Sequence, residues 1–526
     1  MRALLALAVV TLALAAPVCA RADDAGLDAG VDGGLGADAG LDAGTDASAA
    51  TALDAGLDAG PVAGAEIGRG GDPAASVTPA VAAEASSADV IRTLLGLVAL
   101  IVLAYVGGHP RITKLEERLG IAQVMTSGLP YVFLGLLAQQ PALDVLNEST
   151  LRSILPLLQF GLGWIGFQTG FSLEAGALDR VARGTGTVVI LLSSFPFLVI
   201  SGASALFLWA VGLGPDPVAL ARDACLLGLA GALSAPTLER VIGQRMSAPA
   251  LELARAIALL DDVLGVAALA CLAAFLHVGT AADARGHWQL PGVGWIFVTF
   301  GMAVSIGLVV YVVLRGTDSG GEKTSLLLGS VALTAGLAGY LSLSPLVICF
   351  FAGVLLRNLP GDDKPELEGT FRRLERPIYL LFLVIVGALW RIDDWRGWLL
   401  LPVFVGARLI GRYAGARTAR RLPASERPGA LDDTEDRDLV APPMGQLALA
   451  FVVTAQTLYE SPAVQAVVTS VIGGAVLVEV LVQVSSRRAR AVPAAATDAD
   501  PAGPAPDPAP GPDPGPDPAP PPEPGS

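Results

Sequence analysis

Thirteen apolar runs, separated by short segments rich in Gly, Pro and Arg, fill the middle of the chain. Some reach the roughly 20 residues that a helix needs to cross a bilayer, and others are shorter. Short apolar runs interrupted by Gly or Pro are typical of helices that break partway through a membrane. The pattern predicts an all-α polytopic membrane protein with about 13 transmembrane helices. We place them near 91–107, 119–138, 151–168, 187–211, 224–243, 250–276, 292–314, 325–340, 345–358, 372–390, 398–416, 443–459 and 463–484.

The composition agrees with this pattern. Hydrophobic residues make up 53% of the 526 residues and charged residues only 16%, whereas about a quarter of a soluble domain is charged. The net charge of -15 arises largely in the ends, because 13 acidic residues lie in 21–90 and six in 491–526. The membrane part is nearly neutral and has no basic stripe, which argues against a nucleic-acid partner. No Cys-x-x-Cys pair or Cys/His cluster indicates a resident metal or cofactor.

Both ends of the chain differ from the middle. Residues 1–20 read as a signal peptide, with Arg2 before an apolar run and Val18-Cys19-Ala20 as the cleavage site. Residues 21–87 repeat Asp-Ala-Gly, which offers too little apolar surface to fold, so we expect a disordered outer tail. Residues 491–526 contain 14 prolines and predict a disordered, extended cytoplasmic tail. The membrane domain is therefore expected at 88–490.

The distribution of basic residues predicts the orientation. A cleaved leader places the mature N-terminus outside, and thirteen spans then place the C-terminus inside. Under this topology most basic residues fall in inside loops, as the positive-inside rule requires. The outside loops hold four, which are Arg222, Arg285, Arg391 and Arg396. We therefore expect a multi-pass protein of a bacterial inner (plasma) membrane.

Three charged residues fall near the middle of predicted spans, where a charge costs roughly 2.5–3.5 kcal/mol. Asp261 and Asp262 lie about 18 Å along their helix, and their side chains point about 100° apart. The two carboxylates therefore cannot have the same role. Arg408 lies at a similar depth and needs a carboxylate. We predict a buried Asp261–Arg408 pair that leaves Asp262 free. The alternatives are a purely structural acidic pair, and an Arg408 side chain that reaches the inner face.

The free carboxylate suits exchange chemistry. Burial raises the pKa of an aspartate above about 3.9, so such a group can hold a proton near neutral pH. Once deprotonated it can bind a small cation instead, but it cannot hold both. Competition for one site, combined with alternating exposure, couples the two flows. We therefore predict that Asp262 binds the proton and a monovalent metal cation in turn.

A break in the preceding span adds candidate ligands. Residues 229–237 interrupt it with Gly, Ser and Pro, and an unwound stretch frees backbone carbonyls. Ser234 and Thr237 hydroxyls are candidate cation ligands there. An ordinary proline kink, with both hydroxyls bonded to the preceding turn, explains the same pattern. Glu479, in the last span, is a further buried charge for which we expect a structural role.

These residues resemble the monovalent cation/proton antiporter (sodium/proton exchanger) superfamily. Asp261-Asp262 after Ala-Leu-Leu, preceded by the broken 229–237 segment, carry the resemblance. Further segments are similar to family motifs in the family's order: 161–174, 380–387, 407–411 and 443–450. The similarity extends over about 91–484. One departure is the order Ser234-Ala235-Pro236-Thr237, in which the family has Ser-(Ser/Ala)-Thr.

The resemblance implies two inverted repeats, discontinuous crossed helices, a homodimer and elevator-like alternating access. It also implies that Asp262 carries the cation and the proton, that Asp261 pairs with Arg408, and that no cofactor is used beyond the transported Na⁺ or K⁺ and H⁺. We thus expect a secondary active transporter, not an enzyme. The alternatives are a small-anion/sodium symporter on a related fold and a transport-inactive sensor. An intramembrane aspartyl protease is disfavoured, because adjacent acids on one helix diverge.

Overall fold

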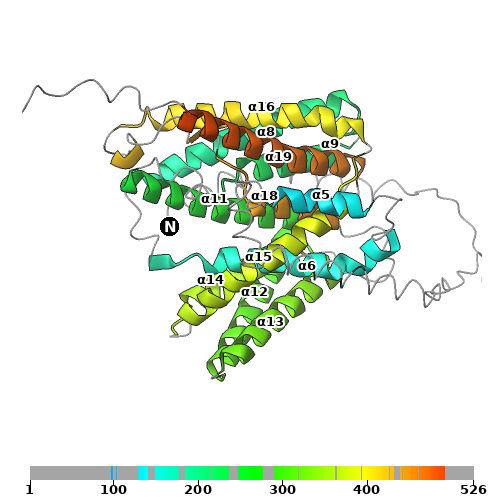
Figure 1. Cartoon of the computed structure of the whole chain (residues 1–526), viewed down its shortest axis with the longest axis vertical. Helices are drawn as coiled ribbons and strands as arrows, with labels where there is room; N and C mark the ends of the chain where they lie inside the picture. The colour runs from blue at the N-terminus through cyan, green and yellow to red at the C-terminus, as the bar shows by residue number, and fades with distance from the viewer. Residues whose placement is uncertain are drawn as a thin grey trace, which may run out of the picture.

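The computed structural model describes residues 128–139, 148–176, 184–235, 247–276, 290–423, 427–431, 442–459 and 461–491, except 215, 318, 362, 363, 393 and some side chains, together with isolated positions at 96, 98, 102, 425, 439 and 440. These residues form helices and no strand (Figure 1). The predicted signal peptide and both predicted tails lie outside the described residues, apart from Ala491 at the end of the last helix. So does Thr237.

Twelve α-helices form within the described residues, and each coincides with one of the predicted spans from 119–138 onward. The total of thirteen stays a prediction, because most of 91–107 lies outside the described residues. The helices are α5 (Leu129–Ala138), α6 (Glu148–Phe171), α8 (Thr185–Ala210), α9 (Pro217–Ala232), α11 (Ala248–Phe275), α12 (Gly292–Arg315), α13 (Gly320–Tyr340), α14 (Pro345–Asn358), α15 (Lys364–Leu389), α16 (Trp395–Ala419), α18 (Gln446–Leu458) and α19 (Pro462–Ala491).

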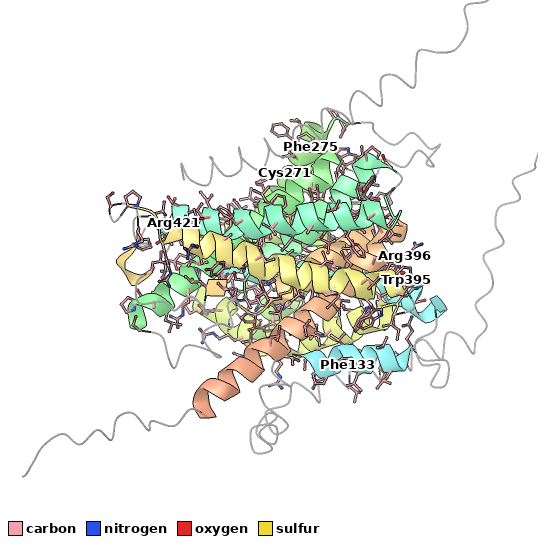
Figure 2. All side chains as sticks on the ribbon, turned by 90° about the horizontal axis from the view of Figure 1, so that it is seen from above. Phe133, Cys271, Phe275, Trp395, Arg396 and Arg421 are labelled. Atoms are coloured by element: carbon pink, nitrogen blue, oxygen red, sulfur yellow. The ribbon has the colours of Figure 1, made fainter. Side chains whose placement is uncertain are left out.

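The outer faces of the bundle carry large apolar side chains. In the part of the chain that the structure describes, five helical segments are long and apolar enough to cross a membrane: α8, α11, α12, α16 and Ala463–Val482 within α19. Phe133, Phe297 and Trp395 are 45%, 73% and 60% exposed. Figure 2 places Trp395 and Arg396 at one end of α16 and Arg421 just past its other end, so arginines flank this helix at both ends. This arrangement suits a bundle surrounded by lipid.

The helices pack as two groups. The scaffold helices, α5, α6, α12, α13, α14 and α15, have α14 lying along α6 and α15 along α5. The site helices, α8, α9, α11, α16, α18 and α19, have α16 lying along α8 and α19. In Figure 1 the site helices α8, α16 and α19 lie at one edge, and α12, α13 and α14 at the other. Each half of the chain contributes to both groups in the same order, in keeping with two repeats.

Glycines allow the scaffold helices to touch backbone to backbone. A Cβ on Gly170 of α6 would lie 2.0 Å from the Phe350 carbonyl oxygen of α14, and one on Gly353 would lie 2.4 Å from that of Phe167. Close approach of helix backbones at small residues drives helix association in membranes. The α5–α15 pair shows the same reciprocal contact through Gly135 and Gly387.

Gly170→Ala is expected to destabilise the protein by about 1–3 kcal/mol, because a methyl group there must push two backbones apart. The matched control is Gly336→Ala on α13, where nothing lies within 4 Å of the added Cβ. That change should be neutral or slightly stabilising, since alanine favours the helix. Thermal unfolding in detergent measures both. Equal shifts for the two variants would contradict the close packing of α6 on α14.

Candidate functional site

Two site helices break near the middle of the bundle. α9 ends at Ala232, and Leu233 is already extended with ψ 144°. Residues 442–445 run without helix before α18 begins at Gln446. The Ala235 amide donates to the Pro443 carbonyl oxygen at 3.0 Å, which joins the two breaks. The helix therefore ends within 229–237, as expected, and residues 233–235 run without helix, while the segments at 236–246 and 432–438 lie outside the described residues.

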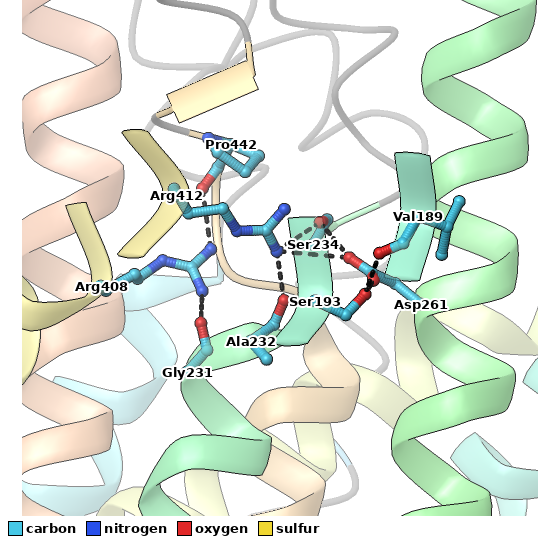
Figure 3. Close-up of polar contacts among 9 residues, drawn as sticks. All are labelled: Val189, Ser193, Gly231, Ala232, Ser234, Asp261, Arg408, Arg412 and Pro442. Atoms are coloured by element: carbon cyan, nitrogen blue, oxygen red, sulfur yellow. Dashed lines mark hydrogen bonds and ion pairs between the residues drawn. The ribbon is translucent and has the colours of Figure 1, made fainter. Parts of the chain in front are cut away.

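Arg408 joins the two breaks a second time. From α16 its guanidinium donates to the Gly231 carbonyl oxygen at the end of α9, and at 3.0 Å to that of Pro442 (Figure 3). A helix end leaves its last carbonyls without partners and carries partial negative charge, so a buried cation is stabilised there. Arg408 is 1% exposed, which excludes the alternative that it reaches the inner face.

Arg412, one turn beyond Arg408, is the ion-pair partner of Asp261. Its Nη2 lies 3.3 Å from Asp261 Oδ2, and the same nitrogen donates to the Ala232 carbonyl oxygen. The predicted Asp261–Arg408 pair is therefore wrong. The two arginines share one face of α16, about 6 Å apart along its axis. Arg408 meets the carbonyl oxygens of both breaks, and only Arg412 reaches α11.

Two serines complete the surroundings of Asp261. Ser234 accepts from Arg412 Nη2 at 2.7 Å and donates to Asp261 Oδ2 at 2.7 Å. Ser193 of α8 donates to Asp261 Oδ1 and also lies 2.8 Å from the Val189 carbonyl oxygen. Ser234, expected as a cation ligand, is thus bound to the ion pair. The sequence reasoning missed Ser193, although a serine within an apolar span was a signal.

Asp262 lies apart from this network. Its residue is 6% exposed, and the structure records no hydrogen bond or ion pair between it and any other described residue. A buried carboxylate without a partner is costly, so it favours a proton or a bound cation. Among the described residues, no three His, Cys, Asp or Glu side chains gather to hold a metal ion.

Glu479 lies half-buried on α19 and has interaction partners. Its expected structural role stays a prediction. The described part of the site thus contains four buried charges: Asp261, Asp262, Arg408 and Arg412.

Comparisons with known proteins agree with this geometry. A family model described as "Sodium/hydrogen exchanger, transmembrane" matches residues 90–489. The structure is similar to that of the sodium proton antiporter MjNhaP1 from Methanocaldococcus jannaschii, with 17% sequence identity and a TM-score of 0.51. The similarity covers 76% of this chain and 97% of the other, and at this identity it shows a shared fold. A search of the curated proteins finds no match.

Proposed function

Because the chain belongs to the sodium/hydrogen exchanger family, and so is a multi-pass membrane antiporter of cations and protons, we propose that it exchanges Na⁺ or K⁺ for H⁺ at Asp262. The observation that carries this proposal is the difference in surroundings between two adjacent carboxylates. Asp261 is held by Arg412, Ser234 and Ser193. Asp262 is buried and has no such partner among the described residues.

The mechanism follows from what each group can do. Asp261 is paired with Arg412, so its charge is compensated inside the bundle. Asp262 must itself be compensated, either by a proton or by a cation. Since each excludes the other, arrival of a cation displaces a proton. Alternating exposure of Asp262 to the two sides then makes the flow of one drive the other.

The two groups of helices support alternating access by relative movement. Asp262 lies on α11, a site helix that meets the scaffold at α14, and α18 meets it at α6. The side-chain hydrogen bonds to Asp261 join site helices to one another, and the bond between Arg357 and Glu174 joins the scaffold helix α14 to the segment after α6. Two groups that are each held together internally suit sliding of one against the other. A homodimer in a bacterial inner membrane, with its N-terminus outside, completes the proposal.

The rival functions require a different site. A small-anion/sodium symporter would place neutral or basic groups where the substrate binds, and an unpaired carboxylate repels an anion. A transport-inactive sensor has no need for an uncompensated Asp262. Both alternatives therefore leave this costly feature unexplained.

Everted vesicles or proteoliposomes test the proposal directly. Adding Na⁺ or K⁺ is expected to dissipate a preset pH gradient, and choline is not. Comparing Na⁺, K⁺ and Li⁺ at several pH values identifies the cation. A gradient unaffected by all three would overturn the proposed exchange. Cation uptake that requires a co-added organic anion would support the symporter instead.

A further inference from the structure

Residues 390–394 connect α15, a scaffold helix, to α16, a site helix. If the two groups move against each other, as the proposed function requires, this connector must bend or travel with one of them. All of its residues except 393 are described. Its contacts therefore show to which group it is attached.

The connector is bound by one hydroxyl of α19. Thr469 is 0% exposed, and its Oγ1 accepts from the Trp390 indole nitrogen at 3.2 Å. The same oxygen donates to the Arg391 carbonyl oxygen at 3.3 Å. The hydroxyl therefore accepts one hydrogen bond and donates another, and its two partners are consecutive residues of the connector.

Packing around Thr469 holds the same segment. A Cβ on Gly397, in the first turn of α16, would lie 2.7 Å from Thr469 Cβ, so the two helices touch there. The Trp390 and Trp398 rings lie 5.9 Å apart, and the Trp398 indole donates to the Ile392 carbonyl oxygen at 3.1 Å. The connector is thus folded onto α16 and α19, both of which are site helices.

On its other side, the chain stays with the scaffold up to Gly387. A Cβ there would lie 2.0 Å from the Val132 carbonyl oxygen of α5, so α15 and α5 pack backbone to backbone at this point. The passage from scaffold contact to site-helix contact therefore occurs between Gly387 and Trp390. We propose that Thr469 is a positioning residue that fastens the connector to α19, so that the connector moves with the site helices and the bend occurs within residues 387–390.

Thr469→Val tests this attachment, because valine keeps the shape and removes both hydrogen bonds. In the wild type, the backbone amides of 390–397 should exchange with deuterium as slowly as those of α16. In the variant they should exchange about tenfold faster. In proteoliposomes, the Vmax of cation/proton exchange should fall about tenfold with KM unchanged, since the site itself is intact. Thr469→Ser, which restores the hydroxyl, should return both values to within twofold of the wild type.

Ser470→Ala is the matched control. Ser470 is adjacent and equally buried, but its hydroxyl donates to Val467 in its own helix at 2.9 Å. It should leave amide exchange in the connector and Vmax unchanged. Trp390→Phe, which removes only the indole N–H, provides a second variant with the same expected direction should Thr469→Val fold poorly.

Three results would overturn the attachment. The first is deuterium exchange of the connector amides in Thr469→Val at the wild-type rate. The second is an effect of Ser470→Ala as large as that of Thr469→Val. The third is faster amide exchange in Thr469→Val that is spread evenly over all helices. Deuterium exchange needs no transport. A wild-type protein that fails to exchange cations would therefore refute the proposed function, while the attachment is still tested by the connector amides.

Discussion

Asp262→Asn is expected to reduce cation/proton exchange to the level of vesicles without the protein. Asparagine has nearly the same shape, but it neither binds a proton at neutral pH nor carries the charge that holds a cation. The variant should still fold, because Asp262 has no hydrogen bond or ion pair to another described residue. Its unfolding temperature should equal or exceed that of the wild type, since a buried uncompensated charge is removed.

The controls separate loss of the carboxylate from general damage. Asp262→Glu keeps the charge and should retain measurable exchange with an altered apparent affinity. Glu252→Gln removes an exposed carboxylate from the same helix and should leave exchange unchanged. Dissipation of a pH gradient by added cation, at matched amounts of reconstituted protein, measures all three. Wild-type exchange by Asp262→Asn would refute the proposed role of this residue.

Arg412→Gln is expected to destabilise the protein by about 3–5 kcal/mol, because it strands the buried Asp261 carboxylate. Adding Asp261→Asn should recover part of that loss, since the stranded charge is removed as well. The two changes should therefore be strongly non-additive. Chemical or thermal unfolding of the two single variants and the double variant in detergent gives the coupling energy.

Arg408 provides the matched cycle. Arg408→Gln should also destabilise, because each lost bond from a charged donor to a carbonyl contributes about 1.5–3 kcal/mol. Its combination with Asp261→Asn should be closer to additive, since the recorded partners of Arg408 are the Gly231 and Pro442 carbonyl oxygens. A larger coupling of Asp261 to Arg408 than to Arg412 would restore the pair that the sequence predicts.

The helices were predictable from sequence because lipid imposes one strong requirement on them. A span must be apolar for most of its length, so each of the twelve described helices corresponds to an apolar run that can be recognised in the sequence. The depth of Asp261 and Asp262 follows from counting along one helix. The break after α9 was visible for the same local reason, since Gly, Ser and Pro cluster at 231–236.

The partners within the site were not predictable in the same way. Arg408 and Arg412 lie on one face of α16, and which of them meets Asp261 depends on where α16 and α11 lie along α8 and α9, against which both pack. Ser193 lies 68 residues from Asp261 and contacts it only through that packing. The freed carbonyls of α9 were expected to serve a transported cation, whereas guanidinium groups of the protein occupy those of Gly231 and Ala232.

That occupation has a consequence for the ions that the protein can admit. The α9 carbonyls with their partial negative charge stabilise both guanidinium groups, and Asp261 cancels the charge of Arg412. Of the four charged site residues, Asp262 is then left to be compensated, and a proton or a singly charged metal ion there makes the carboxylate neutral. A calcium or magnesium ion would leave one positive charge, in a medium where each uncompensated charge costs several kcal/mol. We therefore expect that divalent ions are not transported, and that calcium added in the vesicle assay does not dissipate the pH gradient.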